Sequence, residues 1–480
     1  MHCRRFLVPS SFTGSIILGS AVGLLMVLAV TCDARGQEYH VGDRVVVIEP
    51  CALSVGQDKV CDLELGAALW VESIHGDYLW LNSGKPGWLN KSHVVPLNRQ
   101  VIDRINALIA KDPQDAQLYK SRASVWTALG KLGLATADSE QAILLKPSAE
   151  NWCSRGTVYW LRGEHDQAIA DFSESLRLDP EYVGAYTSRG LVRVVTGEYE
   201  AAIADFTEAL RLDPNSANAY ANRGAAWLMT GEFDKAIADL DEALRMDPMD
   251  ASAYNIRGNA WMGKSDFAKA IADLSLSIKL APNNASAYHN RANVWREKSE
   301  YDRAIADYSQ ILRIKPDDAK TYYRRGEMWQ VKSDLDKAIA DYTETLRLEP
   351  SHSCAFYKRG LAWFGKAQYD KAIADYREAL QLNAKNSDLL NDAAWLMATC
   401  PDPAIRNGNQ AVQYATEACQ STEFPIPNRF GTLAASYAES GDFEKAVEWQ
   451  RKAVEIAPEG EREDYRQRLK LYESGQPYRL

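Results

Sequence analysis

The chain has 480 residues, of which 46% are hydrophobic and 25% are charged, and its formal net charge is −10. Binding to nucleic-acid phosphates depends on an excess of Lys and Arg. This chain has 55 basic and 65 acidic residues, so we expect no nucleic-acid partner. Its length allows several domains, or an array of repeated units that grows by stacking and needs no single large core.

Residues 1–36 have the order of a secretory signal: two arginines, an apolar run at 16–30, and a small-x-small sequence at 34–36. We interpret them as a cleaved signal peptide. The alternatives are an uncleaved membrane anchor and a lipid-modified Cys32. All three interpretations predict that the rest of the chain is exported to the periplasm or cell envelope. Contact with a membrane is expected only through this segment.

Residues 37–97 consist of short β-branched or aromatic runs separated by Gly, Asp and Asn, which predicts about five strands. A Trp-containing run at 78–81 is followed by a turn and then by a Gly-Trp-Leu run at 87–89. This pattern resembles the bacterial SH3-like domain, which implies a small β-barrel. The resemblance implies a groove between tryptophans that binds cell-wall peptide. The alternative is that the tryptophans form the barrel core.

Four of the eight cysteines form two candidate disulfides, Cys51 with Cys61 and Cys400 with Cys419. The alternative for each pair is small buried thiols. Neither pair has the spacing of metal ligands, so we expect no metal and no cofactor. The chain also lacks the GxSxG, HExxH, P-loop and GxGxxG motifs in a catalytic setting, and we therefore expect no enzyme activity.

A period of 34 residues dominates the rest of the chain. In the unit 219–248, Tyr220, Gly224 and Trp227 lie at helical spacing on one face, and Gly231 ends the run. A second run places apolar residues on one helix face and ends at a proline. Two antiparallel helices per unit are therefore predicted. Eight regular units begin at Leu118, Asn151, Ala185, Ala219, Ala253, Ala287, Thr321 and Ala355.

The repeated series of aromatic, Gly, aromatic, Gly, aromatic, Ala, large apolar, Ala and Pro resembles the tetratricopeptide repeat. The resemblance covers about three quarters of the chain. It implies an all-α solenoid, a superhelix of antiparallel helix pairs, preceded by the small SH3-like β-barrel. We expect a linker and capping helix at 98–117, eight regular repeats at 118–388, an irregular ninth repeat with an inserted loop at 389–426, a tenth repeat at 427–460, and a C-terminal capping helix and tail at 461–480.

All eight regular units carry an Arg where the general pattern has an aliphatic residue, and an Asp follows it sixteen residues later. Arg223 with Asp239 and Arg257 with Asp273 are two of these pairs. Because the Arg lies in the first helix and the Asp in the second, antiparallel packing can bring them side by side. A partly buried guanidinium needs a partner, so we predict structural ion pairs. The alternative is an exposed site for an anion.

Family members bind a protein or peptide ligand on a concave groove lined by the first helices, and the resemblance implies the same scaffold function here. The residues projected into this groove are apolar toward the N-terminus and polar or cationic toward the C-terminus. An extended peptide with a carboxylate at one end would fit such a groove. The alternative is that the apolar residues pack against neighbouring helices. The projected residues include Trp160, Leu191, Leu228, Met229, Tyr323, Arg324 and Lys358.

Asn259, Asn290, Lys320 and Arg324 also match positions of the carboxylate clamp found in chaperone-binding members of the family. Asn255 stands where the clamp has its first Lys, which removes one of the charges that would hold a terminal carboxylate. The alternative function is a cell-wall binding module, in which the SH3-like region holds peptidoglycan peptide and the solenoid presents partners.

Overall fold

The computed structural model describes residues 99–421 and 425–480, with side chains from residue 101, and the backbone of seven strands between residues 44 and 96. The predicted leader lies outside the described residues. Among the described helices, none is both long enough and apolar enough to cross a membrane.

The seven strands pair antiparallel in one sheet with the order β3-β2-β6-β5-β4-β1-β7. The strands β5 and β6, which carry Trp80 and Trp88, are neighbours, and these two residues lie opposite each other. An SH3-like barrel and its peptide groove stay predictions for this region. The strands are β1 (Arg44–Val47), β2 (Cys51–Val55), β3 (Asp58–Leu63), β4 (Ala68–His75), β5 (Tyr78–Asn82), β6 (Gly87–Asn90) and β7 (Val94–Pro96).

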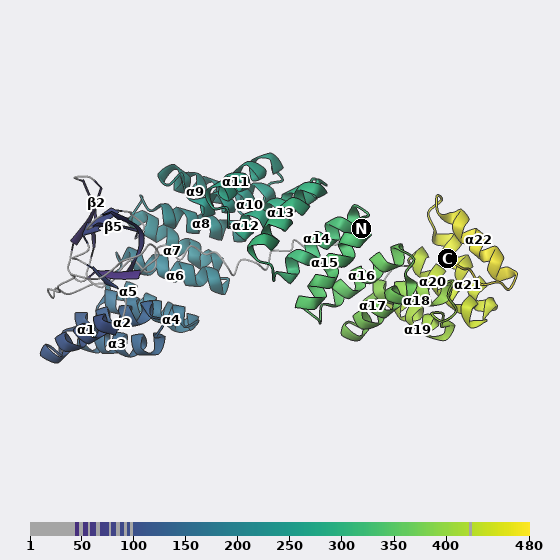
Figure 1. Cartoon of the computed structure of the whole chain (residues 1–480), viewed down its shortest axis with the longest axis horizontal. Helices are drawn as coiled ribbons and strands as arrows, with labels where there is room; N and C mark the ends of the chain where they lie inside the picture. The colour runs from purple at the N-terminus through teal and green to yellow at the C-terminus, as the bar shows by residue number, and fades with distance from the viewer. Residues whose placement is uncertain are drawn as a thin grey trace. The chain divides into compact units, whose positions relative to one another are not determined.

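The helices follow the predicted period, and Figure 1 shows them as successive pairs. α1 (Arg99–Lys111) precedes the pairs, and α22 (Arg462–Glu473) covers the last of them. The first helices are α2 (Ala116–Ala128), α4 (Ala149–Leu161), α6 (Val183–Thr196), α8 (Ala217–Met229), α10 (Ala251–Gly263), α12 (Ala285–Glu297), α14 (Ala319–Val331), α16 (Ser353–Gly365), α18 (Ser387–Thr399) and α20 (Pro427–Ser440). The second helices are α3 (Leu132–Leu145), α5 (His165–Leu178), α7 (Tyr199–Leu212), α9 (Phe233–Met246), α11 (Phe267–Leu280), α13 (Tyr301–Ile314), α15 (Leu335–Leu348), α17 (Tyr369–Leu382), α19 (Gly408–Gln420) and α21 (Phe443–Ile456).

Local chemistry fixes where these helices begin and turn. Many first helices start after a Ser, Asp or Asn whose side-chain oxygen accepts a hydrogen bond from a free backbone N–H group. Ser216 accepts from Ala219 at 3.3 Å, and Asp250 accepts from Ser252 at 2.8 Å. Between α8 and α9 the backbone turns at Gly231, whose φ of +81° favours glycine because it has no Cβ.

The helix pairs divide into two compact units, with the boundary between Pro282 and Asn283. In most regular repeats one large side chain from the second helix fills the space beside the first helix. In the regular repeats from the second to the eighth this side chain is almost fully buried. The residues are Phe172, Phe206, Leu240 and Leu274 in the first unit, and Tyr308, Tyr342 and Tyr376 in the second.

The ninth pair departs from the others at the loop between its helices. Eight residues, 400–407, join α18 to α19, whereas three residues, 366–368, join α16 to α17. The loop ends beside α18, because the backbone N–H of Asn407 donates to the carbonyl oxygen of Met397 at 3.0 Å.

The predicted disulfide between Cys400 and Cys419 is absent, and both thiols are free. Cys400 lies near the start of α19, whereas Cys419 lies near its end, roughly 15 Å or more away at the rise of an α-helix. A disulfide needs Cα atoms within about 7 Å. In the register of β2 and β3, Cys51 lies opposite Leu63 and Cys61 lies opposite Leu53. The Cys51–Cys61 disulfide stays a prediction. No three His, Cys, Asp or Glu side chains are grouped as metal ligands in the described residues.

Candidate functional site

All eight predicted Arg–Asp pairs are present as bidentate ion pairs. In each pair the Arg Nε and Nη2 donate to the two carboxylate oxygens of the Asp at 2.6–3.0 Å. The Asp residues are 3–8% exposed. Burial raises the pKa of Asp171 and Asp341, although the bonded guanidinium opposes this shift. In each pair the guanidinium engages both carboxylate oxygens, so the pair joins the first and second helices of its repeat, as the structural interpretation predicted.

At least five of these arginines also contact the preceding repeat, and Arg122 makes the equivalent bond to Asn106 of α1 at 2.6 Å; the sequence interpretation missed these contacts. Each donates from Nη1 to an oxygen of the residue sixteen positions earlier. The sequence contains a signal for this contact, because the position sixteen residues before the Arg holds Ser, Thr or Asp in each of these five cases. The contacts are Arg189 to Ser173, Arg223 to Thr207, Arg257 to Asp241, Arg325 to Ser309 and Arg359 to Thr343, at 2.6–3.1 Å.

The first helices of the second unit, α12, α14, α16 and α18, present a row of side chains that we call the first-helix face. It includes Asn293, Lys320, Tyr323, Gln330, Tyr357 and Lys358. It is polar and aromatic, as the sequence predicted for this end of the array. The hydroxyl of Tyr342 donates to Gln330 at 2.8 Å, and that of Tyr308 donates to Asn293 at 3.4 Å. The tyrosines that replace Phe and Leu in the second unit therefore hold amide side chains of this face in place. The change from Phe or Leu to Tyr is visible in the sequence, but the sequence interpretation did not use it.

Two tyrosines of this face are held by different partners. The Tyr323 ring stacks on His352, with ring centroids 4.9 Å apart. The Tyr357 hydroxyl donates to the Asp392 carboxylate at 2.7 Å, and burial raises the pKa of Asp392. Asp392 was not among the predicted site residues. These contacts fix the orientation of both rings, which favours a preformed binding surface.

The cations of the first-helix face differ in their availability. Arg324 donates from Nη1 to Glu327 at 2.9 Å, so part of its charge is already compensated. Lys320 is exposed and Lys358 is half-buried, and neither forms an ion pair with a described residue. Lys320 and Lys358 are thus the two predicted site residues that present uncompensated charge.

His289 lies on α12, close enough to Lys320 and Arg324 of α14 to be affected by their charges. Burial, together with the charges of Lys320 and Arg324, lowers the pKa of His289 to about 4, from 6.5. The folded protein therefore favours neutral His289, and unfolding takes up a proton between about pH 6.5 and about pH 4.

Stability is consequently expected to be complete above about pH 6.5 and to fall as the pH decreases toward about 4. His289→Gln should remove part of this fall, because glutamine cannot take up the proton. Thermal unfolding between about pH 7 and about pH 4.5 measures both proteins. Parallel profiles for the two proteins would contradict this assignment.

The apolar residues of the first unit are mainly packed rather than open. Trp160 packs against the buried Leu191 and Phe206, and Leu228 packs against the cluster around Leu240. The alternative interpretation, packing against neighbouring helices, therefore holds for Trp160, Leu191 and Leu228. Met229 is half-buried and keeps some exposed surface.

The predicted carboxylate clamp is incomplete. Asn290 is only 9% exposed on α12, and Arg324 is engaged by Glu327. Asn259 lies on α10 in the other unit, and its Oδ1 is buried without a hydrogen-bond partner among the described residues. Of the four residues predicted for the clamp, Lys320 alone presents an exposed charge.

Residues 478–480 of this chain contact the C-terminal end of α18 in the ninth repeat. The Tyr478 ring is 5.7 Å from the Trp395 ring of α18. Arg479 donates from Nη1 to the carbonyl oxygen of Ala398 at 3.1 Å. The backbone N–H of Leu480 donates to the carbonyl oxygen of Thr399 at 3.0 Å. Arg479 also pairs with Glu439 at 2.5 Å. The C-terminal residues thus contact the end of a first helix through one aromatic contact, one backbone hydrogen bond and one side-chain hydrogen bond to a carbonyl oxygen.

Family models of the tetratricopeptide repeat match residues 153–217, 187–251, 228–285, 257–319, 331–387 and 430–459. Tetratricopeptide repeat protein 13 of Homo sapiens is 32% identical over 75 residues, which are 16% of this chain and 9% of that protein. Hsp70-Hsp90 organizing protein 3 of Arabidopsis thaliana is 29% identical over 83 residues, which are 17% of this chain and 15% of that protein. This chain therefore matches a small part of either relative.

Among solved structures, a tetratricopeptide repeat protein from Parabacteroides merdae is 17% identical, with a TM-score of 0.43. The similarity covers 54% of this chain and 99% of that protein.

Proposed function

This chain belongs to the tetratricopeptide repeat family of protein-interaction scaffolds, and we propose that its first-helix face binds an acidic, extended segment of a partner protein. The observation that carries the proposal is the pair of uncompensated lysines, Lys320 and Lys358, beside the oriented rings of Tyr323 and Tyr357. Charge-assisted hydrogen bonds to a carboxylate are stronger than neutral ones. The rings supply flat apolar surface for the side chains on either side of the carboxylate.

The contact of residues 478–480 with the C-terminal end of α18 supports a related mode of binding on the neighbouring helices. A segment can attach there through backbone groups and one aromatic side chain without adopting a helix. We therefore propose an extended ligand, with acidic side chains contacting Lys320 and Lys358.

The name of the Arabidopsis relative associates that protein with chaperones. For this chain, the buried Asn290 and the Arg324–Glu327 pair argue against tight capture of a terminal carboxylate. We propose recognition of side-chain carboxylates instead. The proposed setting is the cell envelope, which rests on the order of charged, apolar and small residues in the leader.

Lys320→Glu combined with Lys358→Glu is expected to weaken binding to an acidic partner segment by about a hundredfold, at about tenfold for each lost contact. Added salt should weaken the wild-type complex in the same direction. The partner is captured from an envelope extract, identified by mass spectrometry, and its acidic segments are then titrated by calorimetry.

Lys315→Glu is the matched control, because Lys315 is exposed in the same unit but follows a second helix, α13. It should bind like the wild type. Equal affinity of all three proteins for the captured segment would exclude the first-helix face as the binding surface.

A further inference from the structure

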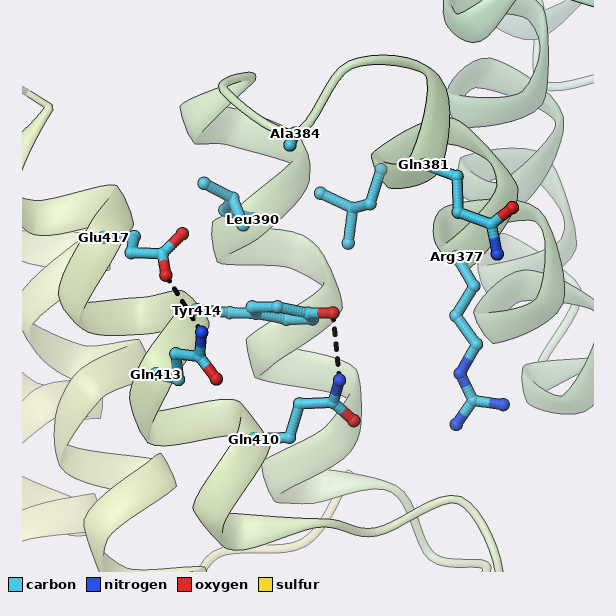
Figure 2. A pocket seen from close by; sticks show the side chains of 9 residues that line it. Arg377, Gln381, Ala384, Leu390, Gln410, Gln413, Tyr414 and Glu417 are labelled. Atoms are coloured by element: carbon cyan, nitrogen blue, oxygen red, sulfur yellow. Dashed lines mark hydrogen bonds between the residues drawn. The ribbon is translucent and has the colours of Figure 1, made fainter.

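A cleft of about 450 Å³ lies between α17, α18 and α19, away from the first-helix face residues discussed above. Its volume falls within the range of roughly 300–1,000 Å³ that is usual for ligand sites. Figure 2 shows the side chains that surround it. They are Arg377, Leu380, Gln381, Ala384, Leu390, Gln410, Gln413, Tyr414 and Glu417.

Arg377 breaks the pattern of the repeats. In five earlier repeats the same position holds the Ser, Thr or Asp that accepts a hydrogen bond from the next repeat's Arg. The ninth repeat has Ala393 where that next Arg would stand, so no guanidinium arrives at this position. The acceptor is replaced by a cation at the point where the row of ion pairs ends.

The guanidinium of Arg377 forms no hydrogen bond or ion pair with a residue that the structure describes. Figure 2 shows it at one side of the cleft, with Glu417 at the other side and the Tyr414 ring between them. The Glu417 carboxylate accepts a hydrogen bond from Gln413 at 3.2 Å. Because Gln413 is neutral, Glu417 keeps its negative charge on its own side of the cleft, and Arg377 presents a positive charge, unpaired among the described residues, on the opposite side.

The remaining lining suits a peptide chain. Gln410 donates to the Tyr414 hydroxyl at 3.0 Å, which leaves that hydroxyl free to donate its own hydrogen. The glutamines of the cleft offer both donors and acceptors, as peptide groups require. Leu380, Leu390 and the Tyr414 ring provide apolar surface for side chains.

We propose that this cleft is a second peptide site, which binds an extended segment with a Glu or Asp side chain on Arg377. The proposal does not rest on the function proposed for the first-helix face, because the two sites share no residue. A solenoid with two such sites could hold two segments of one partner, or two partners.

The test uses two fluorescein-labelled pools of pentapeptides, with either Glu or Gln fixed at the centre. Both pools are titrated against the full chain carrying Lys320→Glu and Lys358→Glu, so that the first-helix face contributes little. We expect the Glu pool to bind about tenfold more tightly than the Gln pool. Hydrogen exchange should show protection of amides in Gly408–Gln420 when the Glu pool is bound.

Arg377→Ser restores the residue type of the other repeats, so the fold should be retained. In this variant the affinity for the Glu pool should fall about tenfold, to that of the Gln pool. The matched control is Arg313→Ser, an exposed arginine of α13, which should change nothing. Equal binding of the two pools, or an unchanged Arg377→Ser variant, would overturn the proposal. Equal protection by acetate would show a small-carboxylate site and overturn the assignment to peptide.

Discussion

Asp205→Ala is expected to lower the free energy of unfolding by about 3–5 kcal/mol, the cost of leaving buried charges without their partner. Asp205 is 3% exposed and accepts from two arginines. Arg189 contacts both of its oxygens, at 2.7 and 3.0 Å, and Arg193 donates from Nη1 at 2.7 Å. Alanine would leave both guanidinium groups partly buried without a carboxylate, so this pair should be the most sensitive of the eight.

Chemical denaturation measures the loss, and hydrogen exchange of α6 and α7 shows whether it is local, since repeat arrays need not unfold in one step. The matched control is Asp241→Ala, because Asp241 also bonds an Arg but its side chain is 57% exposed. Its cost should stay below about 1 kcal/mol. Similar losses in the two variants would show that burial does not set the strength of these pairs.

Gly360→Ala is expected to destabilise the eighth repeat by about 1–3 kcal/mol, the usual cost of overpacking. A Cβ at Gly360 would lie 2.6 Å from Cε1 of Tyr376 and 3.3 Å from the carbonyl oxygen of Ala372. The Tyr376 ring is almost fully buried and has little room to move. Alanine favours the helix by about 1 kcal/mol over glycine, which offsets only part of the clash.

Gly133→Ala isolates the helix preference, because Gly133 lies in α3 with no atom within 4 Å of the added Cβ. This control should stabilise the protein by up to about 1 kcal/mol. Thermal or urea unfolding of both variants gives the comparison. If Gly360→Ala were as stable as Gly133→Ala, the close approach of α16 and α17 would not be the reason for glycine at this position.

The sequence by itself determined the repeating architecture of the helical region. Its period positioned the two helices of each unit, because the spacing of apolar residues specifies which face is buried. The Arg–Asp pairs were also predictable, since a fixed separation of sixteen residues recurs in helices that must pack antiparallel. These features depend on contacts inside one repeat, which a local pattern describes.

Only the tertiary structure decided what happens between repeats and at the irregular end. The packing of Trp160 and the burial of Asn290 depend on how neighbouring helices rotate against one another, and the pattern within one repeat does not contain that rotation. The Cys400–Cys419 bond fails because antiparallel α18 and α19 place the two residues at opposite ends of α19. The cleft beside Arg377 is lined by residues of α17, α18 and α19, so its shape depends on three helices packed together in space.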